Sequence, residues 1–276
     1  MILVTIMHAR GRDEFSWIIG NGPDEKALEY VKHSPTLITK KDWSACTPLH
    51  YAAEFGMTNT VRWLIKQKAD VNAVAYNGFT PMHLVTNGVI AGVLIAGGAD
   101  LNIKDLWGKT PLQEASESGY TNVCDVILAS GYPCDLVSAL QLGRREIAKK
   151  LIREDPLLAK RVLLMGDLWG DVTPLGIAAI KGDEEMVVLL LHAGAPVNEG
   201  TMRPNLGKIT PLCNAVWADH YKIAELLCNA GAECNLPGGK NYANLLDYAQ
   251  KKSDGRMVKL LIAHGGTNAI PNSLLK

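Results

Sequence analysis

Four cysteine and histidine side chains in one stretch of the sequence are the residues best suited to chemistry. They are Cys213, His220, Cys228 and Cys234. Thiolates and imidazoles are preferred zinc ligands, and a structural zinc site takes four of them. Their successive separations of seven, eight and six residues, however, match no common zinc-ligand spacing. We therefore expect neither a metal nor a cofactor, here or elsewhere in the chain.

Histidine also serves as a general base in many enzymes, and His50 and His83 occupy equivalent positions 33 residues apart. No nucleophile stands at a matching position beside either of them, so a hydrolytic site is not indicated. The sequence also lacks a phosphate-binding loop, a dinucleotide fingerprint, an HExxH motif and a GxSxG motif. These absences favour a protein that is not an enzyme.

The charge of the chain limits its partners. With 28 Lys and Arg against 28 Asp and Glu, the net charge is zero, which argues against a general binder of nucleic acid or acidic membranes. One run of basic residues lies between residues 144 and 161. They are Arg144, Arg145, Lys149, Lys150, Arg153, Lys160 and Arg161. Because acidic residues are interspersed, we interpret this segment as a solvated helix surface; a site for an acidic partner, phosphate or nucleic acid is the alternative.

The cysteines and the first residues indicate the compartment. The six cysteines contain no CxxC pair and have no regular spacing, which predicts a reducing, cytoplasmic setting. The apolar start, residues 1–7, is too short for a membrane span of about 20 residues, and no basic segment precedes it. We expect no membrane insertion and no signal peptide, with a weak signal peptide as the alternative.

The composition favours helices packed on helices. The chain has 276 residues, of which 47% are apolar and 20% charged, so it can bury a large core. At roughly 150 residues per domain, the length suggests about two domains. Only 6% of the residues are aromatic, so the core must consist mostly of Leu, Ile, Val and Ala.

A four-residue motif repeats along the chain and decides the fold. Thr47-Pro48-Leu49-His50 returns 33 residues later as Thr80-Pro81-Met82-His83. It returns again at Thr110, Thr173 and Thr210, each followed by Pro. The 63 residues between Thr110 and Thr173 leave room for two units, one of which lacks the motif. A repeat of about 20–50 residues indicates a solenoid or a similar array.

A second motif follows the first in phase. It reads Lys68-Ala69-Asp70-Val71-Asn72 at its first appearance, and it begins with Gly98, Gly194 and Gly231 later in the chain. Thr caps a helix start, Pro fits the first helical turn, and Gly ends a helix in the left-handed conformation. Each unit is therefore predicted to contain a helix, a short loop, a second helix and a hairpin-like finger.

With these two motifs, and an apolar second helix such as residues 187–191 between them, the sequence resembles the ankyrin-repeat family. The segment from Thr47 to Asn72 carries nearly all of the family pattern, and the resemblance covers about residues 14–268. It implies an all-α solenoid of about eight repeats with short extensions at both ends. It also implies a non-enzymatic scaffold, because the family holds other proteins on one surface.

Two departures from the repeat pattern predict local changes. The third repeat is three residues short between Thr80 and Ala99, so its first helix or the loop after it must be shorter. Lys68 stands where the other repeats have Gly, which predicts a lysine in the left-handed region of backbone conformation.

Repeats one and five share features that suggest a division of the chain. Both lack the Thr-Pro motif, and both have a second helix that ends in a proline-containing segment. A tryptophan follows in each, Trp43 and Trp169, four residues before the next motif Thr. We interpret the single solenoid, residues 1–276, as two four-repeat blocks, 14–136 and 137–270, joined head to tail. The alternative is that both repeats drifted from the pattern independently.

The finger tips are the first candidate binding surface, because a solenoid presents one continuous concave face. Polar residues are usual in such turns, but four residues before each motif Thr the chain has Trp43, Tyr76, Leu106, Trp169 and Leu206, with Trp107 adjacent. Exposed apolar patches mark interaction sites, and Trp and Tyr are enriched at binding hot spots. We predict a ladder of partner-binding side chains; the alternative is that the rings fold back and stiffen the stack.

The ends of the first helices are expected on the same face. Seven or eight residues after the motif Thr lie Glu54, Phe55, Lys181 and Trp217, which complete the set of candidate partner-binding residues. Trp63 lies on the leucine row of a second helix and is therefore predicted to be in the core.

The predicted function is binding of another protein, by a chain that is monomeric on its own. Alternatives are a secreted, host-directed effector of an intracellular bacterium and an adaptor subunit of an enzyme complex. The chain also resembles ankyrin domains that an asparaginyl hydroxylase modifies, which have Leu eight residues before Asn; Asn72, Asn102 and Asn235 fit that pattern. The sequence does not identify the partner.

Overall fold

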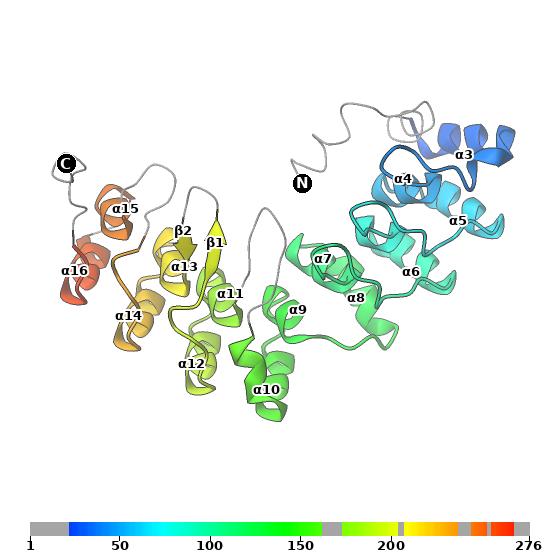
Figure 1. Ribbon diagram of the computed structural model, residues 1–276. Coiled ribbons are helices and arrows are strands. Elements are labelled where there is room, and N and C mark those ends of the chain that lie inside the picture. The colour runs from blue at the N-terminus through cyan, green and yellow to red at the C-terminus, as the bar shows by residue number, and fades with distance from the viewer. Residues whose placement is uncertain (1–21, 162–172, 204–206, 237–243, 253–254, 268–276) are drawn as a thin grey trace. The chain divides into compact units, whose positions relative to one another are not determined.

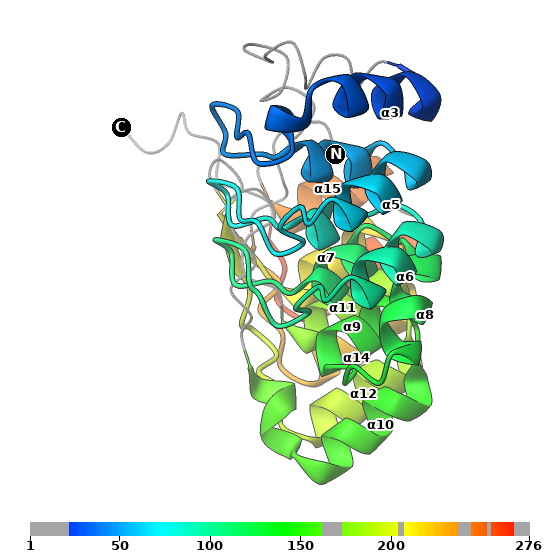
Figure 2. The same ribbon diagram turned by 90° about the vertical axis from the view of Figure 1, so that its right-hand side faces the viewer.

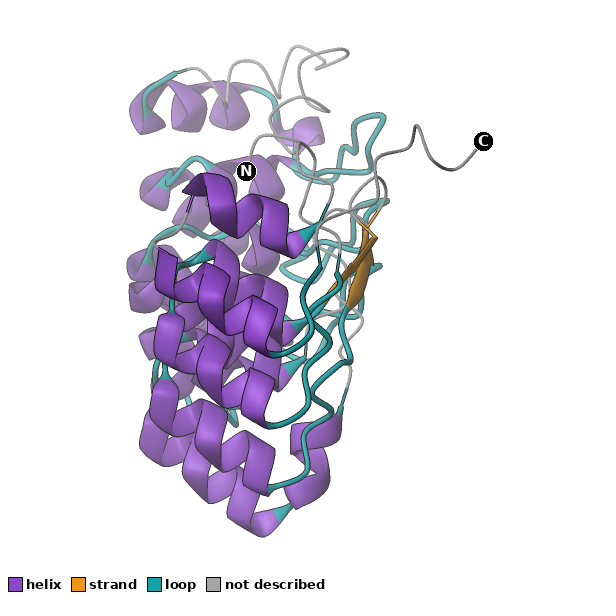
Figure 3. Ribbon diagram, turned by 90° about the vertical axis from the view of Figure 1, so that its left-hand side faces the viewer, coloured by secondary structure: helices purple, strands orange, loops and turns teal. Residues whose placement is uncertain are grey.

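The computed structural model describes residues 22–161, 173–203, 207–236, 244–252 and 255–267. The chain divides into two compact units, residues 1–134 and residues 135–276. Within each unit, pairs of helices are stacked one after another, and the loops that join successive pairs project to one side of the stack (Figure 1, Figure 3). The all-α solenoid predicted from the repeats is confirmed.

Unit 1 begins, in its described part, with α3 (Asp24–His33) and the 3-10 helix η1 (Pro35–Leu37). The next three repeats follow as pairs: α4 (Pro48–Glu54) with α5 (Thr58–Lys66), η2 (Pro81–Leu84) with α6 (Gly88–Ala96), and α7 (Pro111–Glu117) with α8 (Thr121–Ala129). The first helix of each of these pairs begins at the proline of the Thr-Pro motif, where the sequence predicts it.

Unit 2 continues the pattern. Its pairs are α9 (Leu136–Gln141) with α10 (Arg145–Glu154), α11 (Pro174–Lys181) with α12 (Glu184–His192), α13 (Pro211–Trp217) with α14 (Tyr221–Asn229), and α15 (Leu245–Lys252) with α16 (Gly255–Ala263). A 3-10 helix, η3 (Pro156–Lys160), follows α10. One finger forms a short antiparallel hairpin, in which Met202 of β1 (Thr201–Arg203) lies opposite Lys208 of β2 (Gly207–Ile209).

The Thr-Pro motif starts a helix through a box of hydrogen bonds. Thr47 is extended at the N-cap, and Pro48 has no N–H to leave unpaired in the first turn. Nδ1 of His50 accepts the N–H of Thr47 at 3.1 Å, so Nε2 carries the ring proton and donates it to the carbonyl oxygen of Phe79 at 3.1 Å. Burial lowers the pKa of His50 to about 4, and the ring is neutral and structural. His83 forms the same box one repeat later.

Backbone hydrogen bonds join successive fingers of unit 1. The N–H of Tyr76 donates to the carbonyl of Ser44 at 2.9 Å, and the N–H of Leu106 donates to the carbonyl of Asn77 at 3.1 Å. Gly78, with φ of 82°, permits the second approach, because a Cβ there would lie 2.5 Å from the nitrogen of Leu106. The three loops are therefore stacked in register (Figure 2).

The asparagine of the second motif connects one repeat to the next. Nδ2 of Asn72 donates to the carbonyl of Gly98 at 3.1 Å, and Oδ1 accepts the N–H of Asp100 at 2.8 Å. Asn198 and Asn235 make the same two bonds across junctions of unit 2. These bonds fix the segment after each second helix against the following repeat.

Both departures from the repeat pattern have a local structural result. The short third repeat loses its residues from the first helix, since η2 has four residues where α4 and α7 have seven. The loop after η2, residues 85–87, is as long as the loop after α4, residues 55–57. Lys68 has φ of 65°, the left-handed conformation that the sequence predicts, and its N–H donates to the carbonyl of Ile65 at 2.9 Å.

Candidate partner-binding surface

Three apolar side chains at the finger tips of unit 1 are exposed. Trp43 is 50% exposed, Tyr76 73% and Leu106 72%. They occupy the same position in three successive fingers, four residues before the motif Thr. Because the backbones of these fingers are hydrogen-bonded to one another, the side chains stand on adjacent turns. We call Trp43, Tyr76 and Leu106 the finger-tip row.

A buried carboxylate holds the first turn of this row. Oδ1 of Asp42 accepts the N–H groups of Ser44 and Cys46 at 2.9 and 2.8 Å. Its other oxygen, Oδ2, accepts the hydroxyl of Tyr51 at 2.5 Å. Trp43 is therefore presented by a turn whose conformation is set before any partner arrives, which lowers the entropy cost of binding.

The third turn is built in the same way but with a different charge balance. Oδ1 of Asp105 accepts the N–H groups of Trp107 and Lys109 at 2.9 and 2.8 Å, and burial raises the pKa of Asp105. Its Oδ2 is buried without a hydrogen-bond partner among the described residues, because Glu114 stands in the register where the first turn has its tyrosine donor. Burial opposes the charge of Lys109, but contacts with Glu114 at 3.4 Å and Glu117 at 2.5 Å raise its pKa.

Trp107 does not belong to the exposed row. It is half-buried, and its ring packs edge-on against Phe79, with 5.6 Å between the ring centroids. This is the folded-back arrangement that the sequence leaves as the alternative, and a role of Trp107 in partner binding stays a prediction. Trp169 and Leu206, the remaining positions of the predicted ladder, lie outside the described residues.

The candidate residues at the ends of first helices are divided between the two units. In unit 1, Glu54 is half-buried and Phe55 is 37% exposed. In unit 2, Lys181 is exposed, whereas Trp217 is half-buried and packs edge-on against Tyr248 with 6.5 Å between centroids. Phe55 and Lys181 are therefore available to a partner without rearrangement.

Trp63 is half-buried and not in the core, so its prediction as a core residue was wrong. The fully buried residues of α5 are Thr60, Val61 and Leu64, the last of them next to Trp63. Successive residues of an α-helix differ in direction by about 100°, so an error of one residue in the register moves a side chain from the core to its edge.

The four cysteine and histidine residues singled out by the sequence are spread over separate contacts. Sγ of Cys213 lies 3.7 Å from the hydroxyl of Thr210, and Nε2 of His220 lies 3.3 Å from a carbonyl oxygen of α11. Only Cys228 and Cys234 touch one another, with 3.8 Å between their sulfur atoms. Within the described ranges, no group of three or more potential ligands is placed to hold a metal ion.

Acidic residues neutralise much of the basic segment. Arg145 pairs with Asp183 at 2.7 Å, and Lys149 pairs with both Glu146 at 2.9 Å and Glu185 at 2.6 Å. These contacts favour a solvated, ion-paired helix surface over a site for an acidic ligand.

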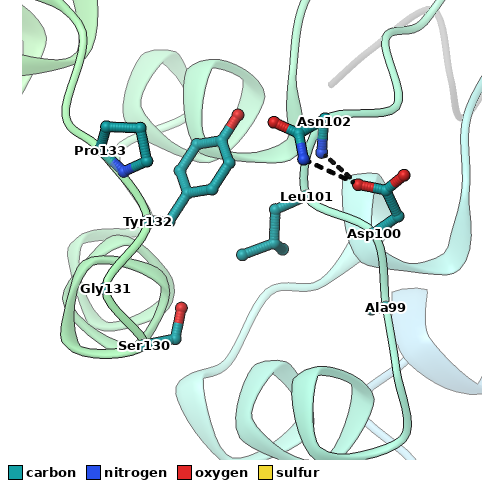
Figure 4. A pocket seen from close by; sticks show the side chains of 8 residues that line it. All are labelled: Ala99, Asp100, Leu101, Asn102, Ser130, Gly131, Tyr132 and Pro133. Carbon is teal, nitrogen blue, oxygen red and sulfur yellow. Dashed lines mark hydrogen bonds between the residues drawn. The ribbon is translucent and has the colours of Figure 1, made fainter.

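The sequence did not predict a pocket of about 390 Å³ in unit 1. In Figure 4, Asp100, Leu101 and Asn102 stand on one side of it, with Ser130, Tyr132 and Pro133 on the other. The pocket occurs at the junction where the asparagine connection is missing. Asn102 donates to Asp100 at 3.0 Å within its own loop, and Pro133 stands where other repeats supply an N–H. Pro133 was the residue from which the sequence could have predicted this missing bond.

Two further features concern the setting of the protein. All six cysteines lie in the described ranges, and none of them forms a disulfide. None of the helices within those ranges has the length and apolar character that crossing a membrane requires.

Comparison with known proteins identifies similar repeats. A family model described as ankyrin repeats in three copies matches residues 16–105 and 136–238. The chain is 28% identical over 227 residues to ankyrin repeat domain-containing protein SAT10 of Stachybotrys chartarum, which covers 78% of this chain and 11% of that protein. It is 29% identical over 193 residues to Rabankyrin-5 of Homo sapiens, covering 68% and 14%, and 31% identical over 187 residues to E3 ubiquitin-protein ligase XBAT32 of Arabidopsis thaliana, covering 66% and 36%. The chain thus spans a minor part of each of these relatives.

Proposed function

Because the chain belongs to the ankyrin-repeat family, whose repeats are generally protein-interaction domains, we propose that it is a non-enzymatic scaffold that binds another protein. The proposed contact surface is the finger-tip row of unit 1 together with Phe55. The proposal also includes further residues in the fingers and at the ends of first helices. They are Trp107, Trp169 and Leu206 in the fingers, and Glu54, Lys181 and Trp217 at the helix ends.

The observation that carries this proposal is the exposure of three large apolar side chains at one register. Isolated exposed apolar residues are common on proteins, but a group of them on adjacent, hydrogen-bonded turns is typical of a binding surface. Lys41 and Lys104 are exposed two residues before Trp43 and Leu106. A partner that offers an apolar strip with acidic residues beside it would complement this surface.

A second candidate role is that of an adaptor subunit in an enzyme complex. One relative is named as an E3 ubiquitin-protein ligase, and this chain matches 36% of its length. In that role the repeats would hold a protein substrate, and catalysis would belong to another domain or subunit. The proposed binding surface is the same in both roles. We further propose that the chain is monomeric without its partner and acts in the cytoplasm, and a secreted, host-directed effector is the alternative.

Site-specific crosslinking tests the surface. A photo-crosslinking amino acid is placed at Tyr76, and in a matched control at Val89, which is 60% exposed but lies in α6 and not in a finger. We expect a partner from native cells to crosslink from position 76 and not from position 89. The double variant Tyr76→Ser/Leu106→Ser should then weaken binding of that partner by roughly 30-fold, as expected for hot-spot residues. Crosslinking from position 89 alone, or unchanged affinity of the double variant, would contradict the proposal.

A further inference from the structure

The contact between Cys228 and Cys234 is set by the way α14 ends. Gly231 has φ of 90°, its N–H donates to the carbonyl of Cys228 at 3.0 Å, and the N–H of Ala232 donates to the carbonyl of Leu227 at 3.0 Å. This helix-ending arrangement turns the chain back over the last helical turn. It brings the side chain six residues after Cys228 against it, and the two sulfur atoms lie 3.8 Å apart.

The same two positions are occupied by different residues in other repeats. Cys228 and Cys234 lie three residues before and three residues after Gly231, which ends the helix. In the other repeats compared, the residues three before and three after the helix-ending Gly or Lys are Ile65 and Val71, Ile95 and Leu101, Leu128 and Cys134, and Leu191 and Val197. Most of these repeats have apolar residues at both positions, so the packing of the two side chains does not require cysteine. Only one of the repeats compared carries a thiol at both places.

The two thiols differ in their tendency to ionise. The hydrogen bond between them, together with burial, raises the pKa of Cys228, and the same hydrogen bond lowers the pKa of Cys234. The thiolate is the nucleophilic form of cysteine. Whichever thiol ionises, its neighbour lies 3.8 Å away and is placed to resolve the product of its oxidation.

We propose that Cys228 and Cys234 are a site of reversible oxidation, at which a small hydroperoxide converts the two thiols to a disulfide. The thiolate of one cysteine attacks one oxygen of hydrogen peroxide, which gives a sulfenic acid and hydroxide. The sulfur of the other cysteine then attacks the sulfur of the sulfenic acid, the S–O bond breaks, and water leaves. In total, two thiols are oxidised to one disulfide and one peroxide is reduced to two waters.

The geometry fits this reaction and restricts its oxidant. Both side chains are 4% exposed, so a bulky or charged oxidant is excluded while hydrogen peroxide, which is small and uncharged, can enter during local opening. A disulfide has an S–S distance of about 2.05 Å, so the sulfur atoms must approach by roughly 1.8 Å from their present separation of 3.8 Å. The product would connect the end of α14 covalently to the segment that leads into the next finger.

The test uses the full chain, reduced and then exposed to increasing hydrogen peroxide. Remaining thiols are alkylated, and the peptides are mapped by mass spectrometry with and without a dithiol reductant. We expect a Cys228–Cys234 disulfide that forms about tenfold faster than oxidation at the buried cysteines Cys46 and Cys213, and that the reductant reverses.

Two single variants, Cys228→Val and Cys234→Val, provide the controls, because other repeats have Ile or Leu at the first position and Val at the second, so valine preserves the apolar packing. Neither variant can form the disulfide, so the remaining cysteine should persist as a sulfenic acid that a dimedone probe captures. Oxidation of all buried cysteines at similar rates would overturn the proposal. So would further oxidation of either cysteine to a sulfinic acid in the unsubstituted protein without a crosslink.

Discussion

Pro133 faces Asn102 across the pocket of unit 1. Asp100 holds the equivalent position in the preceding repeat and donates its N–H to Asn72. Proline has no N–H, so Pro133 cannot make the corresponding bond to Asn102. The two asparagines are equivalent in the repeat pattern, and one substitution in the following repeat changes what the side chain does. Asn72 connects two repeats, whereas Asn102 bonds within its own loop. The pocket lies at this missing connection.

This difference predicts unequal effects of the same substitution. Asn72→Ala removes two hydrogen bonds between repeats and should lower the free energy of unfolding by about 1–2 kcal/mol. Asn102→Ala removes only a bond within the loop and should cost less than about 0.5 kcal/mol. Urea unfolding followed by circular dichroism measures both values. Equal losses would show that the connection contributes nothing to the stability of the stack.

A second prediction concerns the pH dependence of stability. Burial lowers the pKa of His83 to about 4 in the folded chain, whereas an unfolded histidine has a pKa of about 6.5. The unfolded state therefore binds more protons between these two values, so stability is fully present above pH 6.5 and is lost as the pH falls toward 4. His83 alone should lower the free energy of unfolding by about 2 kcal/mol between pH 7 and pH 5.

The variant His83→Gln isolates this effect. Gln113 already closes the equivalent box in the next repeat, where its Oε1 accepts the N–H of Thr110 at 3.0 Å, so glutamine preserves the helix start. Urea unfolding at pH 7 and pH 5 should show a smaller loss for the variant than for the unsubstituted chain. The same loss in both proteins would mean that His83 titrates normally in the folded state.

A third prediction concerns Lys68, whose backbone has φ of 65°. An L-residue with a Cβ is strained in this region, and glycine is not. Lys68→Gly should therefore raise the free energy of unfolding by roughly 1 kcal/mol in urea. As a control, Gln67→Gly, one residue earlier and at negative φ, should be destabilising. A neutral or destabilising effect of Lys68→Gly would point to a compensating contact of the lysine side chain.

The repeats made most of the fold predictable, because each motif residue has a local mechanical role. Thr47 and Pro48 start a helix wherever they occur, and the residue at Lys68 must be left-handed to end one. The exposure of Tyr76 and Leu106 was equally accessible, since the tip of a turn offers little cover. Local rules of this kind act within a few residues and can be read directly from the sequence.

Features that depend on two repeats together were not predictable in the same way. The ring of Trp107 packs on Phe79, which belongs to the preceding finger, and no spacing rule distinguishes that orientation from exposure. Predicting the pocket would have required knowing that Asn102 does not receive the N–H that Asn72 receives from the following repeat. The contact between Cys228 and Cys234 depends on the turn at Gly231, so their spacing in the sequence suggested a zinc site only weakly and a thiol pair not at all.

A fourth prediction tests the division of the chain. A fragment with residues 135–276 contains the helix pairs of unit 2, whereas a fragment with residues 100–220 lacks α6 beside α8 and α14 beside α13. Solenoid repeats are stabilised mainly by their neighbours, so the first fragment should unfold cooperatively in urea and the second should not. Equal behaviour of the two fragments would remove the support for two blocks.

The final prediction compares two adjacent residues of one finger. Leu106 is 72% exposed, whereas Trp107 is half-buried with its ring against Phe79. Leu106→Ala should change the free energy of unfolding by less than about 0.5 kcal/mol, because little apolar area is lost from the interior. Trp107→Ala should cost about 2 kcal/mol, because it removes an aromatic contact and leaves Phe79 more exposed to water.

If Leu106 is a binding residue, its replacement should weaken affinity for the partner while thermal unfolding is unchanged. Trp107→Ala should weaken binding only because part of the protein no longer has a folded finger, so affinity should recover at lower temperature. Weaker binding with unchanged thermal unfolding for Trp107→Ala, and unchanged binding for Leu106→Ala, would assign the binding role to Trp107 instead.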